Sequence, residues 1–184
     1  MNMRTPPPLL EPDDLLRMPG GERYELVDGV PREKPMGAES DEVAVAVGGL
    51  LRAYVRANQL GRVYGSQTGY QCFPAKPKQV RMPDTSFVAK GRLPDEKSPK
   101  GFVKLAPDLA VEVVSPLDTY EEVQAKVTDY REAKVRLVWV VSPETRTVLV
   151  RRLDGTCAEL LESDHLSGED VLPGFACKVA DLFV

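Results

Sequence analysis

Histidine and cysteine are scarce in this chain of 184 residues, which holds one histidine and three cysteines. Zinc fingers and zinc hydrolases need several such ligands at short spacings, so the composition argues against both. Cys72, Cys157 and Cys177 are odd in number and form no CxxC pair. We therefore expect free, buried thiols in a reducing compartment. His165 lies in the polar segment ESDHLSGED, and we expect it at the surface.

Long apolar runs are also missing. The longest, such as 109–114 and 137–141, suit β-strands and fall far short of the ~20 residues that span a bilayer. The first residues, MNMRTPPPLLEPDD, carry prolines and acids in place of an apolar signal core, so we expect a cytoplasmic protein without membrane contact. The chain has no GxSxG elbow, P-loop or dinucleotide fingerprint, which leaves the common hydrolase, kinase and Rossmann functions unsupported.

What is present is the composition of an ordinary globular protein, with 42% hydrophobic and 28% charged residues. We expect a flexible arm over residues 1–8 and a single domain over 9–184. The formal net charge of −4 argues against strong non-specific binding of a polyanion. A middle stretch rich in cations could form a local basic cleft, or equally a solvated loop: Lys76, Lys78, Arg81, Lys90, Arg92, Lys97, Lys100 and Lys104.

Hydrophobic periodicity predicts an α/β (α+β) fold. Three segments have helical spacing: 11–18, 41–58 and 119–133. Ser40 or Asp41 could cap the second helix, and Thr119 with Glu122 forms a capping box for the third. Strands are expected at 23–27, 62–64, 68–73, 84–89, 108–114, 136–141, 147–152 and 157–161. This order predicts a mixed central sheet flanked by helices, with additional antiparallel hairpins and a parallel pair joined by the third helix.

Two acidic residues stand in otherwise apolar strands. In the strand 108–114, a period of two places Val111 and Val113 on one face and Glu112 on the other. Asp84 opens its own strand. A buried charge needs a partner, a metal or a task, and paired carboxylates with a backbone carbonyl suit Mg²⁺. The alternatives are a glutamate paired to an arginine and an aspartate that only starts a turn or strand.

Lys126 lies at the margin of the apolar stripe of the helix 119–133. From there its side chain could reach the carboxylates and bring positive charge to a phosphate or an attacking water. Alternatively it is solvated and pairs with Glu122, one helical turn away. Together Asp84, Glu112 and Lys126 predict a metal-dependent site that cleaves phosphodiester bonds.

Several segments resemble the Uma-two family of restriction endonucleases in the PD-(D/E)XK nuclease superfamily. They are RYELVDG (23–29), RMPDTSFV (81–88), APDLAVEVVSPLD (106–118), Lys126 with Asp129-Tyr130, VRLVWVVSPE (135–144) and VLPGFACKVADLF (171–183). The resemblance covers nearly the whole chain. It implies a restriction-endonuclease-like core, dependence on Mg²⁺ and hydrolysis of nucleic-acid phosphodiester bonds. We expect DNA as the substrate, Mn²⁺ as a substitute for Mg²⁺, and a homodimer that cuts both strands.

The resemblance also implies roles for single residues. Asp84 matches the PD aspartate and Glu112 the second acid, while Val113 would offer its backbone carbonyl to the metal. Val114 stands where the superfamily pattern has its lysine, so Lys126 would supply that lysine from the following helix.

Two further residues and one departure concern the same site. Glu25 resembles an auxiliary acid near the metal, or alternatively positions the hairpin, and Gln67 is a candidate for a contact near the site. Many relatives carry a histidine near 39–41, where this chain has Glu-Ser-Asp. The alternative function is therefore a catalytically inactive nuclease fold that binds nucleic acid or another protein.

Overall fold

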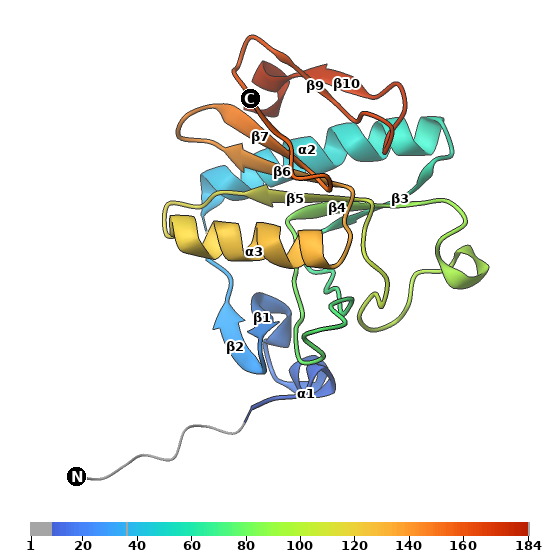
Figure 1. The fold of residues 1–184 in the computed structure, drawn as a ribbon, viewed down its shortest axis with the longest axis vertical. Coiled ribbons are helices and arrows are strands. Elements are labelled where there is room, and N and C mark those ends of the chain that lie inside the picture. The colour runs from blue at the N-terminus through green and yellow to red at the C-terminus, as the bar shows by residue number, and fades with distance from the viewer. Residues whose placement is uncertain (1–8, 36, 184) are drawn as a thin grey trace.

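The computed structural model describes residues 9–35 and 37–183, so the arm predicted over residues 1–8 lies outside the described residues. Figure 1 shows a central sheet with α2 on one face and α3 on the other. The helices are α1 (Pro12–Arg17), α2 (Ala38–Ala57) and α3 (Tyr120–Glu132). Within the described part of the chain, no helix has the length and apolar character needed to cross a membrane.

Six strands form the central sheet in the order β3-β4-β5-β6-β7-β8. They are β3 (Gly61–Gly65), β4 (Thr85–Ala89), β5 (Leu109–Val113), β6 (Leu137–Ser142), β7 (Thr147–Arg152) and β8 (Cys157–Leu160). The pair β5·β6, which α3 connects, is parallel, and the other neighbours in this sheet are antiparallel. The predicted mixed sheet with its parallel crossover pair is confirmed.

Two small antiparallel sheets complete the fold, in agreement with the prediction of additional antiparallel hairpins. One is the hairpin of β1 (Tyr24–Val27) and β2 (Val30–Glu33), and the other pairs β9 (His165–Ser167) with β10 (Ala176–Lys178). Sequence analysis missed β9 and β10 because three residues each are too few to show a period. His165 is exposed, as expected.

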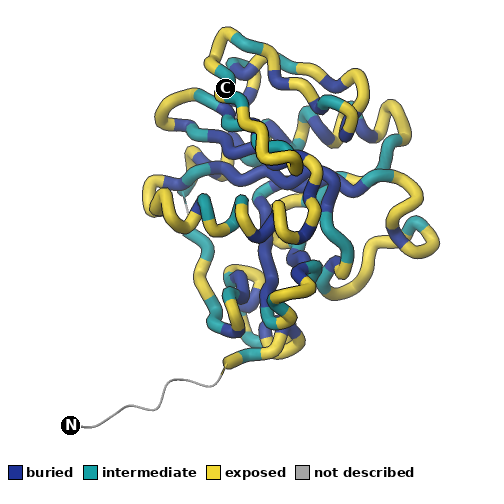
Figure 2. Tube along the Cα trace, viewed as in Figure 1, coloured by how far each residue is buried: buried dark blue, intermediate teal, exposed yellow. Residues whose placement is uncertain are grey.

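The alternation of β5 divides the core into two layers. Val111 and Val113 pack in the cluster that contains Leu51 of α2, whereas Ala110 packs with Tyr130 of α3. Figure 2 shows these central strands as buried segments between more exposed helices. The same parity turns Glu112 toward α3, the face on which Lys126 was expected.

Three local predictions are wrong. The cap of α2 is Gly37, and Ser40 lies inside the first turn, where its hydroxyl donates to the Gly37 carbonyl (3.0 Å). Segment 68–73 is no strand, because Tyr70 and Phe73 enter different apolar clusters and only Tyr70 makes isolated bridges. The three thiols are free, but none is fully buried: Cys72 and Cys177 are half-buried, and Cys157 is exposed because it lies on β8, the edge of the sheet.

The basic-rich middle stretch does not gather into one cleft. Four of its members form ion pairs with carboxylates from other segments: Lys76 with Asp129 (2.5 Å), Lys78 with Glu11 (2.5 Å), Arg92 with Asp108 (2.6 Å), and Arg81 with both Glu25 (2.8 Å) and Asp129 (2.5 Å). Arg81 is buried, with 5% of its surface exposed. These four paired cations therefore serve the fold, whereas the other four, Lys90, Lys97, Lys100 and Lys104, are exposed at the surface.

A buried charged network connects the β1–β2 hairpin to α3. The Arg81 guanidinium donates to Glu25 Oε2 (2.8 Å) and to Asp129 Oδ2 (2.5 Å from Nη2). Glu25 Oε1 accepts a second hydrogen bond from the backbone N–H of Met82 (2.8 Å). Because Met82 lies two residues before Asp84, this network fixes the backbone that carries the candidate aspartate.

We expect Arg81→Met to lower the free energy of unfolding by about 3–5 kcal/mol, because two buried carboxylates would lose their shared cation. Urea unfolding followed by the fluorescence of the buried Trp139 measures the change. The matched control is Arg17→Met, which removes an exposed pair with Asp14 (3.9 Å) and should cost about 1 kcal/mol or less. Equal losses in the two variants would contradict a structural role for the network.

Candidate active site

The pairing of β4 with β5 brings Asp84 beside Glu112. Thr85 lies opposite Val111 in the antiparallel register, so Asp84 extends β4 toward the end of β5. The Asp84 carboxylate accepts a hydrogen bond from the backbone N–H of Val113 through Oδ2 (2.8 Å). The structure thus brings Asp84 and Glu112 close to Val113, whose carbonyl was expected to be a third metal ligand.

Glu112 is buried, with 3% of its surface exposed, and both of its carboxylate oxygens have donors. Lys126 Nζ donates to Oε2 (2.8 Å), and the Tyr130 hydroxyl donates to Oε1 (2.5 Å). Lys126 and Tyr130 are one helical turn apart on α3, so both side chains face β5. The partner of Glu112 is therefore a lysine and a tyrosine, not an arginine.

The alternative placement of Lys126, solvated beside Glu122, is wrong. Glu122 instead forms the predicted capping box, accepting from the backbone N–H of Thr119 (3.0 Å) while the Thr119 hydroxyl accepts from the Glu122 N–H (3.2 Å). Its carboxylate is occupied at the start of α3, which leaves Lys126 to turn inward.

Lys34 is a site residue that sequence analysis missed. It directly follows β2, and its Nζ donates to Asp84 Oδ1 (3.0 Å) and to the Met82 carbonyl (2.7 Å). Its partners lie 48 and 50 residues along the chain, and the docking of the hairpin brings them together. No local pattern around Lys34 could have indicated this contact.

The charges of the site shift one another's pKa values. Burial raises the pKa of Glu112, and although Lys126 opposes this, the nearby carboxylates of Asp84 and Glu25 leave the pKa above its usual value. For Lys126, burial disfavours the charge, but Glu112 and Glu25 outweigh it and raise the pKa. Lys126 is thus a cation at neutral pH.

Glu25 and Tyr130 respond in opposite directions. Burial would raise the pKa of Glu25, but Lys126, Arg81 and the Met82 N–H together lower it. Burial and then the Glu112 carboxylate raise the pKa of Tyr130, so its hydroxyl keeps the proton that it donates. Glu25 is therefore an anion, and the positive charge of Lys126 interacts with both Glu25 and Glu112.

A cavity of about 590 Å³ opens beside these residues, between the first turns of α2 and the ends of β4 and β5. Asp84, Val113 and Lys126 line it, and Gln67 lies on its wall as expected for a contact near the site. Glu112 and Glu25 are not among its lining residues. Glu112 lies behind Lys126, and Glu25 lies in the buried network.

Ser115, which also lines the cavity, is a second residue that sequence analysis missed. Its side-chain oxygen is buried, and no group in residues 9–35 and 37–183 forms a hydrogen bond with it. A buried hydroxyl without a partner is costly, so this oxygen is an unpaired polar group in the wall of the cavity.

The donor set suits a hard cation. Mg²⁺ is usually held by one or two carboxylates and keeps several waters. Asp84, Glu112 and the Val113 carbonyl would supply such oxygen ligands, and an ammonium group already lies against each carboxylate. Among the described residues, no cluster of three or more His, Cys, Asp or Glu side chains is arranged to hold a metal. A cation here would therefore use few protein ligands and would replace or join the lysine contacts.

The fold is similar to that of a solved structure, a "putative nuclease belonging to DUF820" from Anabaena variabilis. The two share 19% sequence identity, the match covers 95% of this chain and 97% of the other, and the TM-score is 0.79. This likeness confirms the predicted nuclease-like fold. No curated protein matches the chain.

The family comparison covers most of the sequence. The model of the Uma2 family, described as "Putative restriction endonuclease", matches residues 12–180. That span contains Asp84, Glu112 and Lys126. The resemblance found in the sequence motifs is confirmed, and the chain belongs to the Uma2 family.

Proposed function

We propose that the protein is a metal-dependent endonuclease that hydrolyses phosphodiester bonds of DNA. The observation that carries the proposal is the convergence of Asp84 and Glu112, each in contact with a lysine, beside a cavity. Two acids that can hold a metal ion and a lysine that can face a phosphate, at the ends of two neighbouring strands, suit such hydrolysis. Membership of the Uma2 family supports the same reaction class.

In this proposal Asp84, Glu112 and the Val113 carbonyl would hold Mg²⁺ or Mn²⁺. When bound, the metal polarises the phosphoryl group and lowers the pKa of an attacking water. Lys126 stabilises negative charge on the phosphate and is no general base, because its raised pKa keeps it protonated at neutral pH. Glu25 acts through Lys126 and Arg81 as a positioning residue, since it does not line the cavity.

The proposal includes two further parts. Gln67 lines the cavity and can contact the sugar or phosphate of a substrate. A homodimer would present two copies of the site, one for each strand of a duplex. Light scattering on the isolated protein measures its mass and tests the dimer separately from the reaction.

The decisive test is nicking of supercoiled DNA, with single-stranded DNA in parallel, in the presence of Mg²⁺ or Mn²⁺. We expect Asp84→Asn and Glu112→Gln to lower cleavage by about 10²-fold or more, the scale on which loss of one electrostatic group acts. Glu121→Gln, an exposed carboxylate on α3, is the matched control and should keep full activity. Equal trace activity in wild type and Glu112→Gln would favour the inactive nuclease fold instead.

Metal binding should depend on pH in a defined direction. A raised pKa keeps Glu112 protonated to a higher pH than the usual 4.5, and a metal must displace that proton. We therefore expect the stabilisation by Mn²⁺ to be weak near this pH and to grow as the pH rises, reaching about 2.7 kcal/mol at a hundredfold excess over Kd. Thermal unfolding with Mn²⁺ and with EDTA measures it. Stabilisation that persists unchanged in Asp84→Asn would place the metal elsewhere.

The two lysines should differ in their effect on cleavage. Lys126 Nζ has one hydrogen-bond acceptor, Glu112, whereas Lys34 Nζ is held by both Asp84 and the Met82 carbonyl. We expect Lys126→Met to lower kcat by about 10²-fold and Lys34→Met by about 10-fold or less. Single-turnover cleavage at saturating metal compares them. The opposite ranking would assign the catalytic cation to Lys34.

A further inference from the structure

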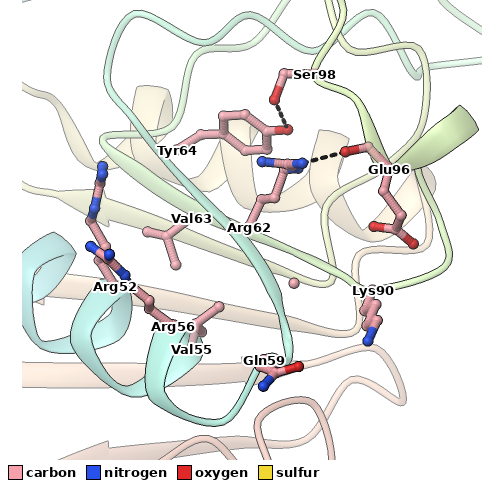
Figure 3. A pocket seen from close by; sticks show the side chains of 11 residues that line it. Arg52, Val55, Arg56, Gln59, Arg62, Val63, Tyr64, Lys90, Glu96 and Ser98 are labelled. Atoms are coloured by element: carbon pink, nitrogen blue, oxygen red, sulfur yellow. Dashed lines mark hydrogen bonds between the residues drawn. The ribbon is translucent and has the colours of Figure 1, made fainter.

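A second cavity, of about 490 Å³, lies between the last turns of α2 and the edge strand β3. Figure 3 shows Arg52 and Arg56 entering it from the helix, Arg62 from the strand, and Lys90 from the end of β4. One lining residue, Glu96, is acidic. The lining therefore carries a formal excess of three positive charges, in a chain whose net charge is −4.

None of these four cations forms an ion pair among the described residues, unlike Lys76, Lys78, Arg81 and Arg92. Among residues 9–35 and 37–183, no ion pair involves Arg52, Arg56 or Lys90. Arg62 donates only to the backbone carbonyl of Glu96, as the dashed line in Figure 3 marks. The Glu96 carboxylate accepts from the backbone N–H of Gly91 and so is engaged in its own loop.

The positions of the arginines cost the free protein some stability. Arg52 and Arg56 are one helical turn apart, where like charges repel by a few tenths of a kcal/mol. All four cations are exposed or line an open cavity, so burial gives no reason for their grouping. An anionic ligand would relieve the repulsion, and guanidinium groups bind phosphate through paired hydrogen bonds.

The basic cavity lies on the same edge of the molecule as the candidate active site. The first half of α2 lines the active-site cavity through Asp41 and Ala44, and its second half lines the basic cavity. Strand β3 runs back along the helix, with Gln67 just beyond its end in the active-site cavity. From Ala44 the helix rises about 12 Å to Arg52 and about 18 Å to Arg56.

We propose that this basic cavity, formed by Arg52, Arg56, Arg62 and Lys90, binds the sugar–phosphate backbone of the nucleic-acid substrate. One strand of a duplex advances about 3.4 Å per nucleotide, so the length of helix between Ala44, on the wall of the active-site cavity, and the two arginines corresponds to about four or five nucleotides. Such contacts position the substrate and carry no sequence information. The proposal rests on the proposed function and extends it to a second phosphate site.

The test is binding without cleavage. Fluorescence anisotropy with a labelled duplex of about 20 base pairs, and with the corresponding single strand, is measured in EDTA between about 50 and 200 mM salt. Arg56→Gln is compared with Arg131→Gln, a matched control because each removes an exposed arginine from the last turn of a helix. The double variant Arg52→Gln/Arg56→Gln extends the series, and circular dichroism confirms that each variant is folded.

We expect Arg56→Gln to weaken binding about 3- to 10-fold and to lower the slope of log K against log salt by about 1, and the double variant to lower it by about 2. Arg131→Gln should leave both unchanged. Equal affinity and slope in wild type and double variant would overturn the proposal, as would equal losses in Arg131→Gln. Binding of inorganic phosphate alone, without oligonucleotide binding, would overturn it in favour of a small-anion site.

The outcome is separable from that of the proposed function. Oligonucleotide binding that depends on Arg56, in a protein that never cleaves, supports the second site and contradicts the endonuclease. Cleavage that depends on Glu112 but not on Arg52 or Arg56, at limiting substrate, supports the endonuclease and contradicts the second site.

Discussion

The hydrogen bond from the Val113 N–H to the Asp84 carboxylate is the contact on which the candidate site depends. In the register of β4 and β5, the residue opposite Val113 is Pro83, which has no N–H and cannot continue the ladder. What Pro83 lacks is a donor to the Val113 carbonyl, and the Val113 N–H, which needs an acceptor, donates to the Asp84 carboxylate instead of a strand carbonyl. The point where β4 stops pairing with β5 is therefore also the point where Asp84 is held. Glu112 lies beside Asp84 because it directly precedes Val113.

The buried carboxylates of the site persist because cations from three segments accompany them. Lys34 follows the hairpin, Arg81 precedes β4 and Lys126 comes from α3. Each ion pair joins two segments, so the charges that balance the site also hold hairpin, sheet and helix together. Removing one partner from such a group leaves an uncompensated buried charge, which costs several kcal/mol. A metal that binds here would replace or join the lysine ammonium groups that already neutralise these carboxylates.

The parts of the site that follow from local periodicity were predictable. The parity of β5 predicted the face of Glu112, and the helical spacing of α3 placed Lys126 within reach of it but left a solvated pair with Glu122 as the alternative. Lys34 and Ser115 were not predictable, because their positions depend on how the hairpin and the start of α2 dock. The helix cap at Ser40 was predicted wrongly for a related reason. A serine near a helix start signals a cap, but the hydroxyl donates to a carbonyl inside the first turn.

The distribution of charge along α2, and not the net charge of the chain, determines where a polyanion can bind. Acids lie in the first turn of this helix and arginine in its last, so its two ends present opposite fields to the same edge of the molecule. At physiological salt such fields decay over about 8 Å, and carboxylates on distant surfaces do not weaken them. A net charge of −4 therefore places little restriction on a polyanion at this edge. What matters is that the cations of the basic cavity form no ion pairs among the described residues, whereas Lys76, Lys78, Arg81 and Arg92 are each paired with a carboxylate.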